Sequence, residues 1–70
     1  MNSFAKNLTE LMKEKNVSQV KLAKHLKVGQ QTISKYMNNK IEPRLDAVIK
    51  IAAFFEVTVD YLLGAKDRYL

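Results

Sequence analysis

Apolar residues recur along this chain at the spacing of an α-helix, and this periodicity limits the possible folds more than any other feature. The first example is Phe4, Leu8, Leu11 and Met12, which are separated by steps of four, three and one. Such steps place side chains on one face of a helix. No strand-like alternation is sustained, and only one proline and two glycines interrupt the sequence. The chain is therefore predicted to be all-α.

Polar residues and glycines divide the chain into five expected short helices. Ser3, Ser18 and Thr58 are the expected N-caps of the first, second and fifth helices, because a hydroxyl accepts a hydrogen bond from a free backbone N–H. A break is expected at residues 16–17 and a turn at 27–29, followed by a third helix at about 30–38 with Asn39 just past its end. Residues 40–44 are expected to form a loop, in which Pro43 is compatible with the first turn of the fourth helix. The fourth helix is expected to end at 55–57, and the fifth to stop at Gly64. Residues 65–70 are expected to form a C-terminal tail.

Length and composition favour one small domain over residues 1–70. The sequence has no cysteine, so neither a disulfide nor a thiolate metal site can stabilise it, and stability must come from apolar burial. The longest strictly apolar run, residues 51–55, is much shorter than the roughly 20 residues that cross a bilayer. With no signal segment at its start, the chain is expected to be a cytoplasmic protein that does not enter membranes.

Positive charge is concentrated in the central third of the sequence. Between Lys15 and Ile41 there are six lysines and no acidic residue. The remaining chain carries six basic and seven acidic residues, so the net charge of +5 arises entirely from this central part. A basic surface of this kind is typical of contact with a polyanion, and the alternative is a solvated lysine-rich face.

The third expected helix has one wholly polar side. At 100° per residue, the side chains of Gln30, Gln31, Ser34, Lys35 and Asn38 fall within a continuous arc of 140°. Glutamine can bond an adenine through two hydrogen bonds, lysine can donate to guanine, and serine can act either way. An ordinary solvent-exposed face is the alternative, but such faces usually include carboxylates, and this arc has none. The pattern favours a helix that enters the major groove of DNA.

Two stretches resemble the lambda-repressor/Cro-like (XRE) family of helix-turn-helix transcriptional regulators. They are SQVKLAKHL at residues 18–26 and VGQQTISKY at residues 28–36, against the family pattern S-Q-x-x-L-A-x-x-L-G-V-S-x-x-x-I-S. Pro43, Ile51–Ala52 and VTVDYLLG at residues 57–64 match later family positions. The resemblance implies a compact five-helix lambda-repressor-like domain, with the helix-turn-helix at about residues 18–38. It also implies a homodimer on a two-fold double-stranded DNA operator, in a protein of bacterial or phage origin.

The resemblance also implies roles for individual residues. Base contacts are expected from Gln30, Gln31, Ser34 and Lys35, and phosphate contacts from Gln19, Thr32, Asn38, Lys40 and Arg44. Gln19 further resembles the family glutamine that braces the recognition helix. The sequence departs from the pattern at Lys27, where glycine is usual, and at Gly29, which replaces the usual serine or threonine cap. A left-handed conformation at Lys27 would cost about 1 kcal/mol.

Phe54 does not fit the expected core. The buried stripe predicted for the fourth helix consists of Leu45, Val48, Ile49, Ile51, Ala52 and Phe55, whereas Phe54 points the opposite way. Two interpretations are open: Phe54 packs under the C-terminal tail, or it forms a dimer contact near Tyr61. His25 is expected at the surface and Tyr36 in the core.

Within the regulator class, the simplest function is a repressor that occupies an operator, and a DNA-binding antitoxin is an alternative. A protein-interaction module with the same fold is a second class, distinguished by binding that does not respond to salt. An enzyme is disfavoured, because one isolated histidine and no paired carboxylates leave no evident acid–base machinery. No metal, cofactor or small-molecule ligand is expected.

Overall fold

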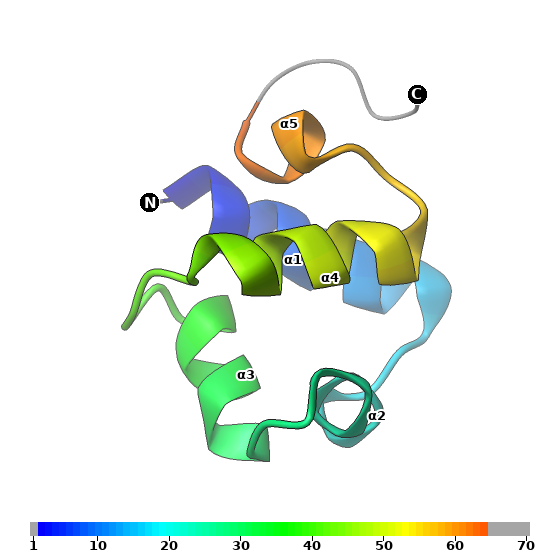
Figure 1. Cartoon of the computed structure of the whole chain (residues 1–70), viewed down its shortest axis with the longest axis vertical. Helices are drawn as coiled ribbons and strands as arrows, with labels where there is room; N and C mark the ends of the chain where they lie inside the picture. The colour runs from blue at the N-terminus through cyan, green and yellow to red at the C-terminus, as the bar shows by residue number, and fades with distance from the viewer. Residues whose placement is uncertain (1, 65–70) are drawn as a thin grey trace.

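The structure, a computed structural model, describes residues 2–64, and within that range all regular structure is helical. The helices are α1 (Asn2–Lys15), α2 (Gln19–Leu26), α3 (Gln30–Met37), α4 (Leu45–Phe55) and α5 (Val59–Leu62). Figure 1 shows α4 lying across the front of α1, with α5 on one side of it and α2 and α3 on the other. The prediction of a compact five-helix fold is confirmed. The expected C-terminal tail, residues 65–70, lies outside the described residues.

Local capping fixes two of the helix starts as expected. The Ser18 Oγ accepts a hydrogen bond from the Lys21 N–H at 3.0 Å, and the Thr58 Oγ1 accepts one from the Tyr61 N–H at 2.9 Å. The Ser3 cap is wrong, because α1 begins at Asn2 and already includes Ser3. Pro43 likewise precedes α4, whose N-cap is Arg44.

Four helices end at a residue in the left-handed conformation, and none of these residues is glycine. They are Asn16, Lys27, Asn39 and Glu56, with φ between 57° and 60°. In each case the next residue donates its backbone N–H to a carbonyl five positions earlier, over 2.8–3.0 Å. This bond satisfies a free carbonyl at the helix end and turns the chain towards the next helix. The departure from glycine at Lys27 therefore leaves the expected left-handed turn intact.

One apolar core joins all five helices. Its fully buried large side chains are Phe4, Leu8, Leu11, Leu22, Ile33, Ile51 and Leu62. The core holds α3 through Ile33 and through Tyr36, whose ring meets that of Phe4 edge-on at 5.9 Å. Tyr36 is thus a core residue, as expected from its side of the helix.

The buried stripe predicted for α4 includes two residues that the structure leaves exposed. Val48, Ile51, Ala52 and Phe55 are buried, but Leu45 is 67% exposed and Ile49 is 51% exposed. The expectation that these two residues belong to the core is therefore wrong. The neighbouring helices cover only part of the apolar arc of α4, and its outer edge faces solvent.

Candidate nucleic-acid interface

Helix α3 presents its polar side outwards because its apolar side is held by the core. Gln30, Gln31 and Lys35 are exposed, and Ser34 is half-buried. Thr32, on the flank of the same helix, is also half-buried. The four residues expected to contact bases therefore share one accessible surface, and three of them extend into solvent.

A hydrogen bond ties the start of α3 to the start of α2. The Gln30 Nε2 donates to the Gln19 Oε1 at 3.3 Å. Through this hydrogen bond Gln19 braces α3, which is the role that the family resemblance implies for it. Because Gln19 uses its oxygen in this bond, its amide N–H groups can donate to a phosphate, while the Gln30 Oε1 can accept from a base. The bond limits the orientations of both side chains and so prepares them for a common ligand.

The other end of α3 is closed by Asn38. Its Nδ2 donates to the Ser34 backbone oxygen at 2.9 Å and to the Ser34 Oγ at 3.3 Å. Since the Ser34 oxygen accepts here, the Ser34 hydroxyl hydrogen remains able to donate outwards. A phosphate contact from Asn38 would compete with this cap, because both use the same amide nitrogen. The i,i+4 spacing of the two polar residues is the sequence signal for this bond.

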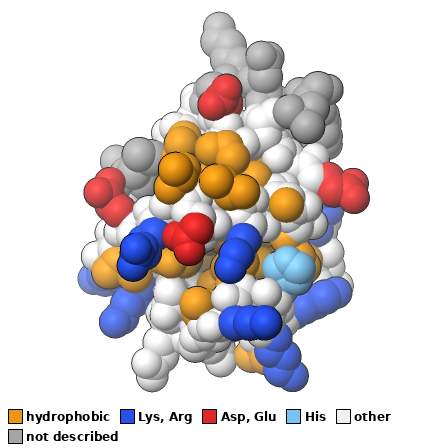
Figure 2. Space-filling view, viewed as in Figure 1, with side chains coloured by type: hydrophobic (Ala, Val, Ile, Leu, Met, Phe, Trp, Pro, Cys, Tyr) orange, Lys and Arg blue, Asp and Glu red, His pale blue; other side chains and the backbone are white. Residues whose placement is uncertain are grey.

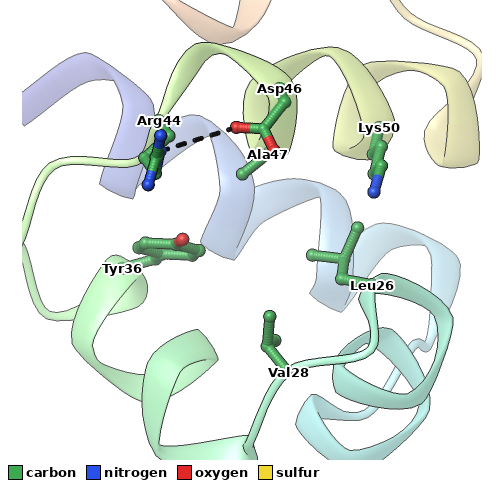
Figure 3. Close-up of a pocket in the computed structure, with 7 residues that line it drawn as sticks. All are labelled: Leu26, Val28, Tyr36, Arg44, Asp46, Ala47 and Lys50. Atoms are coloured by element: carbon green, nitrogen blue, oxygen red, sulfur yellow. Dashed lines mark ion pairs between the residues drawn. The ribbon is translucent and has the colours of Figure 1, made fainter.

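The loop after α3 carries the expected flanking cations. Lys40 is exposed, and its backbone N–H closes the end of α3 on the Lys35 oxygen at 2.8 Å. Arg44 lies at the edge of a pocket between α2, α3 and α4, with Asp46 and Lys50 further along the same edge (Figure 3). Its Nε lies 4.0 Å from the Asp46 Oδ1, and both side chains are largely exposed. So exposed a pair contributes little to stability, which leaves Arg44 able to turn towards a phosphate.

Charge is segregated over the surface. In Figure 2 most Lys and Arg side chains gather in the lower part of the molecule, around α2 and α3, whereas most Asp and Glu side chains lie higher, near α4 and α5. This arrangement follows from the acid-free stretch between Lys15 and Ile41, which contains both helices. The polar side of α3 therefore belongs to the part of the chain that carries the excess positive charge.

Comparison with known proteins agrees with this geometry. A family model described as helix-turn-helix matches residues 8–62, which include all of α2, α3 and α4. The chain belongs to the XRE-type helix-turn-helix family. Three similar proteins are each named as a regulator or activator of transcription. This agrees with the prediction that the chain is not an enzyme.

Two curated members of the family are similar over almost the whole chain. The HTH-type transcriptional activator BcrR of Enterococcus faecalis is 36% identical over 64 residues, which are 91% of this chain and 31% of BcrR. The HTH-type transcriptional regulator ImmR of Bacillus subtilis (strain 168) is 32% identical over 66 residues, which are 94% of this chain and 51% of ImmR. The chain thus spans about a third and about half of the length of these relatives.

A crystal structure of a transcriptional regulator from Listeria innocua is similar in fold. It superimposes with a TM-score of 0.85 at 30% sequence identity, over 96% of this chain and 63% of that one. The arrangement of helices is therefore shared with that regulator over nearly all of this chain.

The structure gives Phe54 a partner within the chain. Its ring lies 4.6 Å from that of His25, centroid to centroid, and 5.0 Å from that of Phe55, and the residue is half-buried. Tyr61 is also half-buried, against the edge of the core. The dimer contact suggested for these two residues remains a prediction. Sequence reasoning missed the contact with His25, because nothing local indicates that α2 approaches the far side of α4.

No group of three or more histidine, cysteine, aspartate or glutamate side chains within residues 2–64 is placed to hold a metal ion. None of the helices in this range is long and apolar enough to span a bilayer.

Proposed function

We propose that this chain binds double-stranded DNA sequence-specifically and regulates transcription, with α3 in the major groove. The observation that carries the proposal is the outward polar face of α3, which has no carboxylate and is tied to α2 by the bond between Gln30 and Gln19. Carboxylates at this position would be repelled by phosphates, whereas amide, hydroxyl and ammonium groups can pair with base edges. The similarity to BcrR, ImmR and the Listeria regulator supports the same function.

The proposed contacts divide into two groups. Gln30, Gln31, Ser34 and Lys35 contact base edges and determine which sequence is bound. Gln19, Thr32, Asn38, Lys40 and Arg44 contact the sugar–phosphate backbone and position the domain. The operator is a palindrome bound by two copies of the chain, since a two-fold dimer places its recognition helices on two half-sites about one helical turn apart.

The test of base contacts is selection of bound sites from random DNA, followed by affinity measurements on the selected sequence. Gln31→Ala should lose about 1–3 kcal/mol at one operator position and relax the preference there. Because Gln31 is exposed, the variant should remain folded. An unchanged selected sequence with Gln31→Ala would contradict the assignment of this residue to base contact.

The test of backbone contacts is the dependence of affinity on salt. Lys40→Ala should weaken binding to all sequences alike and reduce the slope of log K against log [salt] by about 0.9. Lys6→Ala is the matched control, because Lys6 is an exposed lysine on α1, outside the basic third of the chain. Binding that does not respond to salt in the wild type would instead favour a protein-interaction module.

We further propose that regulation is repression by occupying the operator. The exposed side of α2 carries Val20, Lys21 and Lys24 and no carboxylate with which to attract a basic partner surface. BcrR is named an activator, so the direction needs its own experiment. With the selected site placed over a reporter promoter, expression should fall when the protein is supplied. A rise in expression from the same site placed upstream of the promoter would show activation.

A further inference from the structure

A pocket of about 120 Å³ lies between α2, α3 and α4. Figure 3 shows Tyr36 and Arg44 at one end of it and Leu26 and Lys50 at the other. Since Tyr36 lies on the core side of α3, the pocket does not overlap with the residues proposed to contact bases. Sequence reasoning expected no small-molecule ligand, because the walls come from residues 26–28, 36 and 44–50, which only the fold brings together.

The hydroxyl of Tyr36 has no hydrogen-bond partner among residues 2–64, although the residue is only 7% exposed. The ring itself is held by its edge-on contact with Phe4. In Figure 3 the oxygen lies on the side of the ring towards α4, where the pocket is. Buried polar groups in folded proteins almost always have a partner, so an exception requires an explanation. The Tyr36 hydroxyl therefore marks the polar end of the pocket.

The charged residues that line the pocket are two cations and one carboxylate, Arg44, Lys50 and Asp46. The Arg44 Nε lies 4.0 Å from the Asp46 Oδ1, and the two side chains are 91% and 73% exposed. A pair so long and so exposed is weak, and a guanidinium has five N–H donors. Arg44 can therefore donate to a second anion beside the Tyr36 hydroxyl. Hydrogen bonds from a guanidinium to a carboxylate are stronger than those between neutral groups.

The rest of the pocket is apolar and small. Leu26, Val28 and Ala47 line it. A dry cavity of about 150 Å³ holds a benzene molecule, so a pocket of about 120 Å³ fits a slightly smaller apolar body. Inorganic phosphate would leave these apolar walls uncovered, and a neutral ligand would leave the Arg44 guanidinium unused. We propose that the pocket binds a small organic carboxylate with a short apolar body, whose carboxylate accepts from Tyr36 and Arg44.

Such a ligand would compete with DNA for Arg44. This competition rests on the proposed function, in which Arg44 contacts the sugar–phosphate backbone. A carboxylate bound to the guanidinium neutralises its charge and holds it beside Tyr36. Because backbone contacts carry no sequence information, the ligand should weaken binding to all DNA sequences alike. The pocket would thus make DNA binding responsive to a small metabolite-like acid.

A titration of butyrate into the ¹⁵N-labelled chain without DNA tests the pocket itself. Amide signals of Val28, Tyr36 and Ala47 should shift in NMR spectra and reach saturation, with a Kd of about 1–10 mM for so small a ligand. Butyramide has the same shape and no charge, and it should bind at least about tenfold more weakly. Inorganic phosphate is the third ligand, and chloride keeps the ionic strength constant throughout. Phosphate that binds as tightly as butyrate would refute the proposed class of ligand.

Two substitutions assign the binding to the polar end of the pocket. Tyr36→Phe should raise the Kd for butyrate about fivefold, and it should remain folded because it removes a hydroxyl that no described residue bonds. Arg44→Gln should raise the Kd about tenfold. Lys6→Gln is the matched control, because it makes the same change in net charge at an exposed lysine of α1. Shifts that never saturate, or a Kd that neither Tyr36→Phe nor Arg44→Gln changes, would overturn the proposed site.

DNA binding with and without butyrate tests the competition. At a constant ionic strength of about 0.15 M, saturating butyrate should weaken DNA binding by the wild type about fivefold, which corresponds to one phosphate contact. Tyr36→Phe should bind DNA like the wild type but respond less to butyrate. An unchanged DNA affinity of the butyrate-bound wild type would refute the competition for Arg44. A chain that binds butyrate but selects no DNA sequence would refute the proposed function and leave the carboxylate site standing.

Discussion

Lys27 occupies the turn between α2 and α3 in a conformation that lysine rarely adopts. Its backbone has φ 60° and ψ 44°, in the left-handed region. The following residue, Val28, donates its N–H to the Ala23 oxygen at 3.0 Å, so the turn cannot relax without losing a bond that closes α2. Because this turn sets the angle between the two helices of the helix-turn-helix, its stability bears on both folding and the position of α3.

Comparing glycine with alanine at this position isolates the backbone contribution from the lysine charge. The left-handed conformation costs a residue with a Cβ about 1–2 kcal/mol. Glycine avoids that cost but loses about 0.5–1 kcal/mol more conformational entropy on folding. Lys27→Gly should therefore be more stable than Lys27→Ala by about 0.5–1 kcal/mol, which corresponds to about 2–8 °C in melting temperature for a domain of this size.

Thermal and urea unfolding of four variants provide the measurement and its control. Lys24 lies within α2 and is exposed, so Lys24→Gly should be less stable than Lys24→Ala by about 1 kcal/mol. The glycine–alanine difference should thus have opposite signs three residues apart. Glu56, at the end of α4 with φ 57°, should behave like Lys27. If Lys27→Gly is less stable than Lys27→Ala, Lys27 does not adopt the left-handed conformation and the reasoning fails.

Two further substitutions test contacts that hold the ends of the fold together. Gly64→Ala should destabilise by about 1–2 kcal/mol in urea unfolding, because Gly64 has φ 109° and a Cβ there would lie 2.9 Å from the Ser3 Oγ. No loss of stability in Gly64→Ala would contradict this close approach. Asn7→Ala should cost about 1 kcal/mol, because the Asn7 Nδ2 donates to the Tyr61 oxygen at 2.8 Å and so joins α1 to α5. An unchanged unfolding midpoint for Asn7→Ala would show that this bond adds nothing beyond what water provides.

The sequence alone determined the helices and most of their boundaries. Apolar spacing and caps act between residues three or four positions apart, and the bonds at Ser18 and Thr58 form as those residues predict. The polar side of α3 was also determined locally, because burial of Ile33 and Tyr36 on one side forces Gln31 and the other polar residues to the opposite side. The family pattern implied that Gln19 braces the recognition helix, which composition and periodicity could not show, and the structure gives Gln30 as its partner.

The tertiary structure decided how much of each apolar arc is covered. The periodicity of α4 treats Leu45 and Ile49 as equivalent to Val48 and Ile51, yet only the latter pair lies where the core can bury it. Likewise, Phe54 lies opposite the predicted stripe but is half-buried, because α2 brings His25 against its ring. The physical reason is that a helical period reports the direction of a side chain about its own axis, whereas burial depends on which other helix occupies that direction. For this protein, that difference leaves Leu45 and Ile49 open to solvent.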